Sequence, residues 1–281
     1  SKLLVYRDRT VEDRTFRDIP GLIPEGSLMV FNDTKVVPAR LHFQRESGAH
    51  IEIFCLEPVQ PEEYVSMFAV AERCRWKCIV GNVKRWKNDT LHLYNPLNDD
   101  KIENMALRAD LIERCGETSI VEFSWADGSP FSRVLEICGS VPIPPYLNRD
   151  TEEVDLERYQ TLYARFRGSV AAPTAGLHFT PELLEVIKAK GVNVAEVTLH
   201  VGLGTFRPVK VENILEHHMH SEFYMVEEEQ AAIINETKKS GHRVLAVGIT
   251  TIRGLETYVT TNDEVNAYDG WTNKFIFPPH R

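Results

Sequence analysis

The sequence predicts an α/β layered domain that is interrupted by a small antiparallel β-barrel. After about residue 150, segments with a helical pattern alternate with apolar runs, which is typical of an α/β layer. Between residues 41 and 143, short strand-like runs follow one another closely, with turn signals between them, which indicates a small barrel. The predicted boundaries are 1–45 and 144–281 for a discontinuous α/β domain and 46–143 for the inserted barrel.

The first predicted elements are two short buried strands, at residues 2–6 and 27–31, with a turn at 20–26 between them. The residues Asn-Asp-Thr at 32–34 follow the second strand directly, and Asn and Asp at a strand end favour a turn. Because ligands bind at the carboxyl ends of strands in α/β folds, these residues are also candidates for a binding site.

Short strands fill the barrel region, at residues 41–44, 50–54, 77–80, 90–94, 120–123 and 133–137. Turn signals separate them at Gly81–Asn82, Asn88–Asp89 and Asp127–Gly128. The proline-rich run 141–146 predicts a stiff, extended exit from the barrel.

Helices and strands alternate in the rest of the chain. The helices are predicted at 155–163, 180–191, 227–240 and 251–258, and the strands at 192–201 and 243–248. The second helix has the clearest ends, because Thr180 is a cap, Pro181 occupies the first turn and Gly191 follows the last turn.

The bulk composition is that of a cytoplasmic protein. The net charge of −9 argues against indiscriminate binding to nucleic acid, which normally goes with a basic domain. The five scattered cysteines indicate reduced thiols, and Cys74 and Cys78 lack the second close pair of ligands that a structural zinc needs. We find no apolar run long enough to span a membrane, and the first residues do not form a signal peptide.

Glycine and histidine concentrate between residues 168 and 222. Half of the ten histidines lie there, namely His178, His200, His217, His218 and His220. Glycine lets a backbone come close to a ligand, and histidine can carry a proton near neutral pH. This stretch is therefore where the sequence predicts an active site.

A series of motifs, in order along the chain, resembles those of the S-adenosylmethionine:tRNA ribosyltransferase-isomerase (QueA) family of the queuosine pathway. The motifs are residues 31–40, 159–161, 168–180, 198–209, 218–222 and 250–253. The resemblance implies the same two-part fold. It also implies an enzyme that moves the ribosyl part of S-adenosylmethionine onto 7-aminomethyl-7-deazaguanine at the tRNA wobble position. The ribose is rearranged in this reaction, which gives epoxyqueuosine and releases adenine and methionine.

The resemblance implies two substrates and no catalytic cofactor. S-adenosylmethionine is the ribosyl-donating co-substrate, tRNA that carries 7-aminomethyl-7-deazaguanine is the acceptor, and no metal is required because the sulfonium is already the electron sink. We expect a cytoplasmic monomer that does not bind membranes. Family members also have chain before the position of Ser1 and after that of Arg281, and Ile249 stands where a threonine is expected.

The reaction needs a base for the ribose C5′ proton, which the sulfonium acidifies, and a proton or hydrogen-bond donor for the departing adenine. The catalytic candidates are His200, His178, His220, Asp33 and Glu222. The alternative for His200 is a hydrogen-bonded residue at a strand–turn corner, and for His178 a turn that only links a strand to a helix. His218, His220 and Glu222 would share one face of a strand, as a metal site or as a polar loop, but the implied chemistry has no use for a metal.

Candidates for binding the substrates come from the same motifs. They are Asn32, Thr34, Arg40, Ser169, Thr174, Gly202, Gly204, Thr205, Thr250 and Arg253. Asp33 could hold a ribose hydroxyl or the substrate amine, or only form the turn. The two arginines could pair with a carboxylate or phosphate of a substrate, or with structural acids of the protein.

The stretch 73–87 combines six basic residues with two tryptophans and has no acidic residue. This pattern is typical of an RNA-facing surface, where cations bind phosphates and indoles stack on bases. The predicted RNA-binding residues are Arg73, Arg75, Trp76, Lys77, Lys84, Arg85 and Lys87. The alternative is a solvated hairpin whose tryptophans pack into the barrel.

Two other functions compete with the transferase. The first is an RNA-binding homologue without activity, which Ile249 suggests. The second is a different S-adenosylmethionine enzyme, a methyltransferase. A methyltransferase would be supported by a glycine-rich turn after the early strand, but Asn-Asp-Thr stands there and the glycine turns come late.

Overall fold

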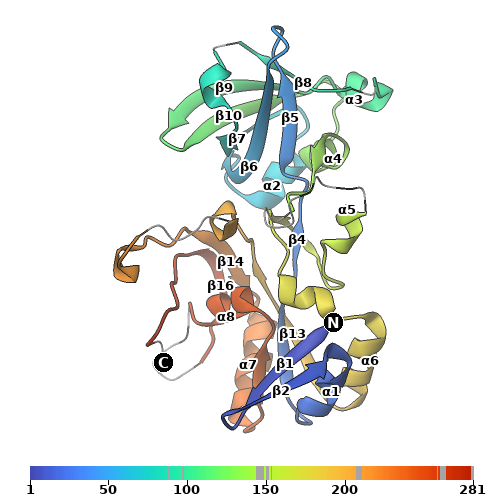
Figure 1. Ribbon diagram of the computed structural model, residues 1–281, viewed down its shortest axis with the longest axis vertical. Helices are drawn as coiled ribbons and strands as arrows, with labels where there is room; N and C mark the ends of the chain where they lie inside the picture. The colour runs from blue at the N-terminus through green and yellow to red at the C-terminus, as the bar shows by residue number, and fades with distance from the viewer. Residues whose placement is uncertain are drawn as a thin grey trace. The chain divides into compact units, whose positions relative to one another are not determined.

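The computed structural model describes residues 1–87, 89–96, 98–143, 149, 152, 154–206, 211–257, 259 and 264–279 (Figure 1). The chain forms two compact units. One consists of Ser1–Lys35 with Arg158–Arg281, and the other of Val36–Glu157. The α/β layers lie in the first unit and the barrel in the second, as the sequence predicts.

The first unit is built on a mixed five-stranded sheet. Its strands, from edge to edge, are β15 (Val244–Ala246), β3 (Leu28–Asn32), β13 (Asn193–Leu199), β14 (Glu222–Val226) and β16 (Tyr268–Thr272). The first three strands are parallel, with Val30 opposite both Ala195 and Ala246, and the last two add in antiparallel fashion. The carboxyl ends of β3 and β13 therefore meet at one edge of the sheet.

Side chains of β3 alternate between the two faces of this sheet, and every residue of the strand is buried. Leu28 and Val30 pack in one core with Ile234 of helix α7 (Glu228–Lys239). Phe31 packs in the other core with Ile187 of helix α6 (Pro181–Ala189). A third helix, α8 (Ile249–Leu255), follows β15. A strand that is covered on both faces reads as a continuous apolar run, and this run at 27–31 is what predicted the strand.

The ends of α6 confirm the prediction from the sequence. The Thr180 hydroxyl accepts a hydrogen bond from the backbone N–H of Leu183 at 3.2 Å, and Pro181 stands in the first turn. Gly191 adopts a φ of +79°, the left-handed conformation that ends helices. The helix predicted at 227–240 is also confirmed, as α7.

The predicted strand at 2–6 forms, but it is not buried. It is β1 (Lys2–Arg7), which pairs only with β2 (Thr10–Thr15) in a separate hairpin, before two short helical turns, η1 (Phe16–Asp18) and α1 (Ile19–Leu22). Leu4 and Tyr6 are 65% and 68% exposed. A two-stranded ribbon packs on the core with one face, so alternate apolar residues remain on the surface.

The second unit is a closed, six-stranded antiparallel barrel, as predicted. In order around the ring, its strands are β5 (Arg40–Gln44), β6 (His50–Gln60), β7 (Arg73–Val80), β10 (Thr118–Ser124), β9 (Arg108–Cys115) and β8 (Leu91–Leu93). Pairing of Phe43 with Leu93 joins the last strand to the first. A two-residue strand, β11 (Gly139–Ser140), adds to β5. Thus β5 belongs to the barrel sheet, although the boundary expected from the sequence lies just after it.

Short helices complete the barrel unit, namely α2 (Tyr64–Ala69), η2 (Val83–Arg85), α3 (Asp100–Met105), α4 (Phe131–Cys138) and α5 (Asp155–Arg158). The strand predicted at 133–137 is wrong, because these residues lie in α4. Phe131, Val134 and Leu135 are its buried residues, and this spacing is that of one helix face. The helix predicted at 155–163 is also too long, since only α5 forms.

Seven strands of the described chain were not predicted, namely β2, β4 (Thr34–Val36), β9, β11, β12 (Phe166–Ser169), β14 and β16. The second half of β9 is exposed and charged, so it lacks the alternation that reveals a strand. Of these, β4 and β12 form a two-stranded sheet beside the site described below. Parts of four predictions lie outside the described residues: Asn88, residues 144–146, residues 207–209 and Tyr258.

Candidate active site

A buried amide joins the carboxyl ends of β3 and β13. Asn32 accepts a hydrogen bond from the backbone N–H of Leu199 and donates to the carbonyl of the same residue, both at 3.0 Å. The amide also donates to the hydroxyl of Thr250 at 3.3 Å. The Asn32 side chain therefore pairs with Leu199 as a backbone C=O and N–H would. Its bond to Thr250 brings the start of α8 to the carboxyl ends of the two strands.

Asp33 lies at this edge of the sheet with its side chain only 2% exposed. One carboxylate oxygen accepts a hydrogen bond from the Thr198 hydroxyl at 2.7 Å, and the other lies 3.5 Å from Nε of Arg165. Burial raises the pKa of Asp33 to about 6, although the Thr198 hydrogen bond and the Arg165 charge oppose the shift. This carboxyl group therefore changes its charge close to neutral pH.

His200 is held in a chain of hydroxyl groups. Its Nδ1 lies 2.8 Å from the Thr34 hydroxyl, which lies 3.0 Å from the Ser169 hydroxyl. The Ser169 oxygen also accepts the backbone N–H of Val201 at 2.7 Å. The chain is satisfied when Nδ1 of His200 carries the proton and donates to Thr34, which donates to Ser169; this tautomer is assigned from the network.

The imidazole of His200 is neutral at pH 7. The residue is 5% exposed, and its ring stacks on Phe223 at 5.5 Å. Burial lowers the pKa of His200 to about 3, because the charged form would lose its hydration. A base of such low pKa is weak, so the environment favours His200 as a neutral hydrogen-bonding group.

The pH dependence of stability tests this assignment. Between about pH 6.5 and 3 the unfolded chain binds a proton at His200 that the folded protein does not, so the stability is complete above pH 6.5 and is lost as the pH falls. His200→Gln removes this proton. From about pH 4 to 6, the free energy of unfolding of the variant, measured with urea, should rise less steeply than that of the wild type, by about 1.4 kcal/mol per pH unit. Equal slopes would mean that the folded protein already carries a charged imidazole.

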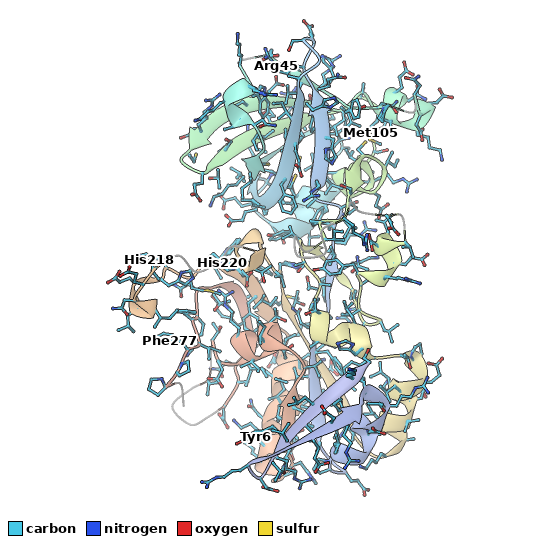
Figure 2. All side chains as sticks on the ribbon, in the orientation of Figure 1. Tyr6, Arg45, Met105, His218, His220 and Phe277 are labelled. Atoms are coloured by element: carbon cyan, nitrogen blue, oxygen red, sulfur yellow. The ribbon has the colours of Figure 1, made fainter. Side chains whose placement is uncertain are left out.

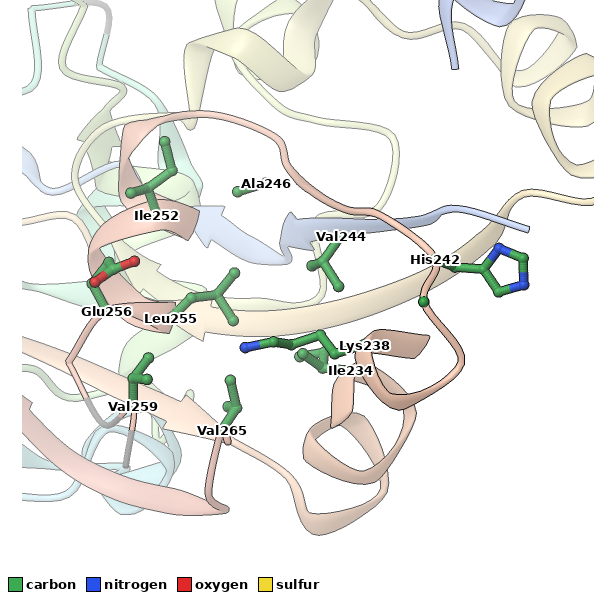
Figure 3. Close-up of a pocket in the computed structure, with 11 residues that line it drawn as sticks. Ile234, Lys238, His242, Val244, Ala246, Ile252, Leu255, Glu256, Val259 and Val265 are labelled. Carbon is green, nitrogen blue, oxygen red and sulfur yellow. The ribbon is translucent and has the colours of Figure 1, made fainter. Parts of the chain in front are cut away.

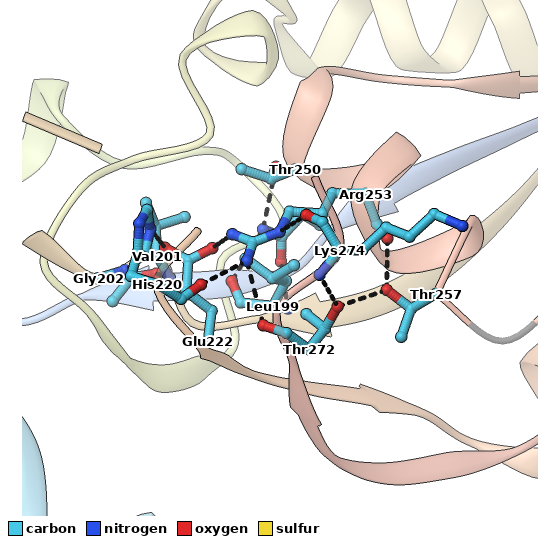
Figure 4. A network of polar contacts seen from close by, with 12 residues as sticks. Leu199, Val201, Gly202, His220, Glu222, Thr250, Arg253, Thr257, Thr272 and Lys274 are labelled. Carbon is cyan, nitrogen blue, oxygen red and sulfur yellow. Dashed lines mark hydrogen bonds and ion pairs between the residues drawn. The ribbon is translucent and has the colours of Figure 1, made fainter. Parts of the chain in front are cut away.

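A second cluster surrounds Glu222, the first residue of β14 (Figure 4). Its side chain is 4% exposed. One oxygen accepts the backbone N–H of Gly202 at 2.7 Å and lies 3.0 Å from Nε2 of His220. The other oxygen pairs with Nη1 of Arg253. The carboxylate is therefore shared between a histidine that is partly exposed and an arginine that is buried.

Arg253 of α8 has all three of its nitrogens engaged. Besides Glu222, it donates to the backbone carbonyls of Lys274 at 2.9 Å, His220 at 2.7 Å and Thr272 at 3.1 Å. Burial lowers the pKa of the guanidinium, and the charge of Glu222 opposes the shift. Of the two alternatives from the sequence, pairing with a structural acid is the one realised in these contacts.

The glycines predicted to bind the substrate contact the second cluster. A Cβ added to Gly204 would lie 2.0 Å from the ring of His220, so only glycine allows this approach. Thr205, in the same turn, is exposed, whereas Gly202 donates to Glu222 as described.

Three residues predicted to be catalytic or to bind the substrate make no described contact with either cluster. His178 lies in the 3-10 turn η4 (Thr174–His178), is exposed, and its Nδ1 lies 3.0 Å from the Ser1 hydroxyl. Thr174, at the start of the same turn, is exposed as well. Arg40 belongs to the barrel unit, where it pairs with Glu52 at 2.8 Å.

The three neighbouring histidines do not form a metal site with other residues of the described chain. His218 and His220 lie on the same loop before β14 (Figure 2). Within the described ranges, no group of three or more His, Cys, Asp or Glu side chains is arranged to hold an ion.

The basic strip of the barrel differs from the prediction in its aromatic part. Trp76 of β7 is 2% exposed and packs against Phe131 at 5.7 Å between ring centroids. Trp86 is 1% exposed and donates from its indole to the carbonyl of Asp89 at 2.9 Å. Both indoles are buried, so stacking of Trp76 on a base, as predicted, does not fit this structure. Alternation along β7 explains the outcome, because residues at even positions point inward.

The cations of the strip remain on the surface. Arg75 pairs with Glu122 at 2.8 Å and Lys77 with Glu57 at 3.1 Å. The others are exposed, namely Arg73, Lys84, Arg85 and Lys87. Pairing with acids reduces the positive potential that Arg75 and Lys77 can offer to a phosphate.

A cavity of about 530 Å³ lies elsewhere in the first unit, between α7, β15 and α8 (Figure 3). Its walls are largely apolar, with Ile234, Val244 and Leu255 among them, and they include the basic Lys238 and the acidic Glu256. None of the residues predicted as site residues is among those that line it. The polar clusters and this cavity are thus formed by different side chains.

Two partners of the site were missed in the sequence. Thr198 precedes Leu199-His200 in a recognised motif, so the motif itself was the signal for it. Arg165, whose guanidinium is near both Asp33 and Glu196, stands in no motif and gave no signal.

None of the helices in the described ranges has the length and apolar character required to cross a membrane.

A family model described as "Queuosine biosynthesis protein" matches residues 1–281. The S-adenosylmethionine:tRNA ribosyltransferase-isomerase of Acetivibrio thermocellus is 42% identical, over 100% of this chain and 76% of that protein. The enzyme of the same name from Sulfurihydrogenibium sp. is 40% identical, over 99% of this chain and 75% of that protein. A crystal structure of S-adenosylmethionine tRNA ribosyltransferase from Thermotoga maritima is 31% identical, over 100% of this chain and 73% of that one, with a TM-score of 0.41. The chain therefore belongs to the queuosine biosynthesis protein family.

Proposed function

We propose that this chain is a tRNA-modifying enzyme that transfers and isomerises the ribosyl group of S-adenosylmethionine. The acceptor is 7-aminomethyl-7-deazaguanine at the tRNA wobble position, and the products are epoxyqueuosine, adenine and methionine. The enzyme uses no catalytic metal or other cofactor and acts as a monomer in the cytoplasm. The proposal is supported by relatives with this enzyme name at 40–42% identity over essentially the whole chain.

The observation that carries the chemistry is the carboxyl group of Asp33. The step beside the sulfonium needs a base whose pKa is near the working pH. Asp33 is buried at the carboxyl ends of two parallel strands, with a pKa of about 6. Asp33 is thus the proton acceptor for C5′ in this proposal, a role that sequence considerations gave first to histidines.

The remaining candidates take supporting parts. His220 is held by the buried carboxylate of Glu222, and its side chain is 30% exposed, so it is the proton donor to the departing adenine. His200 stays neutral and offers hydrogen bonds within its chain of hydroxyls. The exposed cations of the barrel contact tRNA phosphates.

A single incubation tests the proposal. The protein is mixed with S-adenosylmethionine and tRNA that carries 7-aminomethyl-7-deazaguanine, and the nucleosides are analysed by mass. Epoxyqueuosine with an equal amount of free adenine is the expected result. Bound but unmodified tRNA would instead mean an RNA-binding homologue, and a methylated nucleoside would mean a methyltransferase. Unmodified tRNA that lacks the deazaguanine base is the control, which should give no adenine.

A further inference from the structure

Two buried hydroxyl groups in the first unit have no hydrogen-bond partner within the described chain. They belong to Thr161, which is 6% exposed, and to Tyr163. A buried hydroxyl without a partner destabilises a protein, because the hydration it loses is not replaced. Such a group calls for an explanation, and binding of a polar ligand is one.

Both side chains meet the same glycine. A Cβ added to Gly176 would lie 2.0 Å from the Tyr163 hydroxyl and 2.8 Å from the Thr161 methyl group. Gly176 stands in η4, the turn of the recognised motif at 168–180, whose other residues Thr174 and His178 are exposed. The glycine thus allows two hydroxyl-bearing side chains to reach a turn near the surface, yet neither hydroxyl bonds to that turn.

The pair lies close to Asp33. The ring of Tyr163 packs on Phe31 of β3 at 4.4 Å between centroids, and Asp33 directly follows that strand. Two residues further along the chain from Tyr163, the backbone N–H of Arg165 donates to the Asp33 carbonyl at 2.6 Å. Burial raises the pKa of both Asp33 and Tyr163, and the charge of the neighbouring Glu196 raises each further. Tyr163 is therefore linked to Asp33 through Phe31, Arg165 and Glu196.

Resting on the proposed function, we propose that Thr161 and Tyr163 bind the ribose hydroxyls of S-adenosylmethionine beside Asp33. A hydroxyl side chain both donates and accepts, which matches a ribose hydroxyl. A carboxylate at a strand end is a common partner for ribose in α/β folds. The apolar ring of Phe31 beside the pair favours a neutral group over the charged carboxylate or sulfonium of the substrate.

Two conservative variants, Tyr163→Phe and Thr161→Val, remove each hydroxyl and keep the shape of the side chain. The dissociation constant of S-adenosylmethionine, measured by calorimetry, should rise roughly five- to tenfold in each, as for the loss of one neutral hydrogen bond. The KM for S-adenosylmethionine should rise by a similar factor, and kcat should change less. The melting temperature without ligand should not fall, since an unpartnered hydroxyl has been removed.

Tyr224→Phe is the matched control. Its hydroxyl is likewise buried without a partner in the described chain, but Tyr224 lies in the core of the opposite sheet face. The control should keep the affinity of the wild type. Unchanged affinity in Tyr163→Phe and Thr161→Val, with product still formed, would overturn this inference and leave the proposed function intact. A wild-type protein that binds no S-adenosylmethionine and forms no product would overturn both.

Discussion

Arg253→Met is expected to destabilise the protein by about 3–5 kcal/mol, as found when one partner of a buried ion pair is removed. Methionine has a similar length but cannot neutralise Glu222, which stays buried with an uncompensated charge. Three backbone carbonyls also lose the donors that Arg253 provides. Urea denaturation at pH 7 measures the effect as a lower midpoint.

Two further variants make the result specific. Arg253→Met combined with Glu222→Gln leaves no buried charge, so it should be more stable than Arg253→Met alone. Arg14→Met breaks the exposed pair with Glu12 and should leave stability essentially unchanged. A loss in Arg253→Met no larger than that in Arg14→Met would contradict a buried ion pair.

Asp33→Asn is expected to lower kcat by about 10²–10⁴-fold, the usual contribution of a general base. Stability should move in the opposite direction. Because the folded-state pKa is raised, the stability linked to this carboxyl group is complete below about pH 4 and is lost as the pH rises through about 6. At pH 7 the variant is therefore expected to be more stable than the wild type, by up to about 3 kcal/mol.

The pH profile of kcat/KM identifies the group. Thr198→Val removes the hydrogen bond that favours the charged carboxylate, so the acidic limb of the profile should move to higher pH. If Asp33 had only a structural role, the acidic limb of the kcat/KM profile would stay at the same pH in Thr198→Val. Activity of Asp33→Asn within about tenfold of the wild type would exclude it as the base.

The sequence predicted the parts of the fold in which local pattern and tertiary environment agree. The strand at 27–31 is covered on both faces and reads as a continuous apolar run, and α6 carries both of its caps in the sequence. Helix α4 was misread because Val134, Leu135 and Ile137 resemble a short strand when Phe131 is left out. The pattern at β9 fades where the strand is charged and solvated.

For the site, the motifs pointed to residues but not to their environments. His178, His200 and His220 looked equivalent in the sequence, yet one is exposed, one is buried and neutral, and one is held by a carboxylate. Burial by distant segments makes these differences, and so does the pairing of Glu222 with a residue of α8. Neither follows from spacing along the chain.

The closure of the barrel also affects how this unit opens. Every strand of the ring is bonded on both sides, so no strand can leave without breaking two ladders at once. The ladders are unequal, however: β8 pairs over two residues with β5 and over two with β9, whereas β10 pairs over six with β7. Fluctuations that expose backbone amides to solvent exchange therefore begin at β8, while β6, β7 and β10 stay protected until the whole unit unfolds.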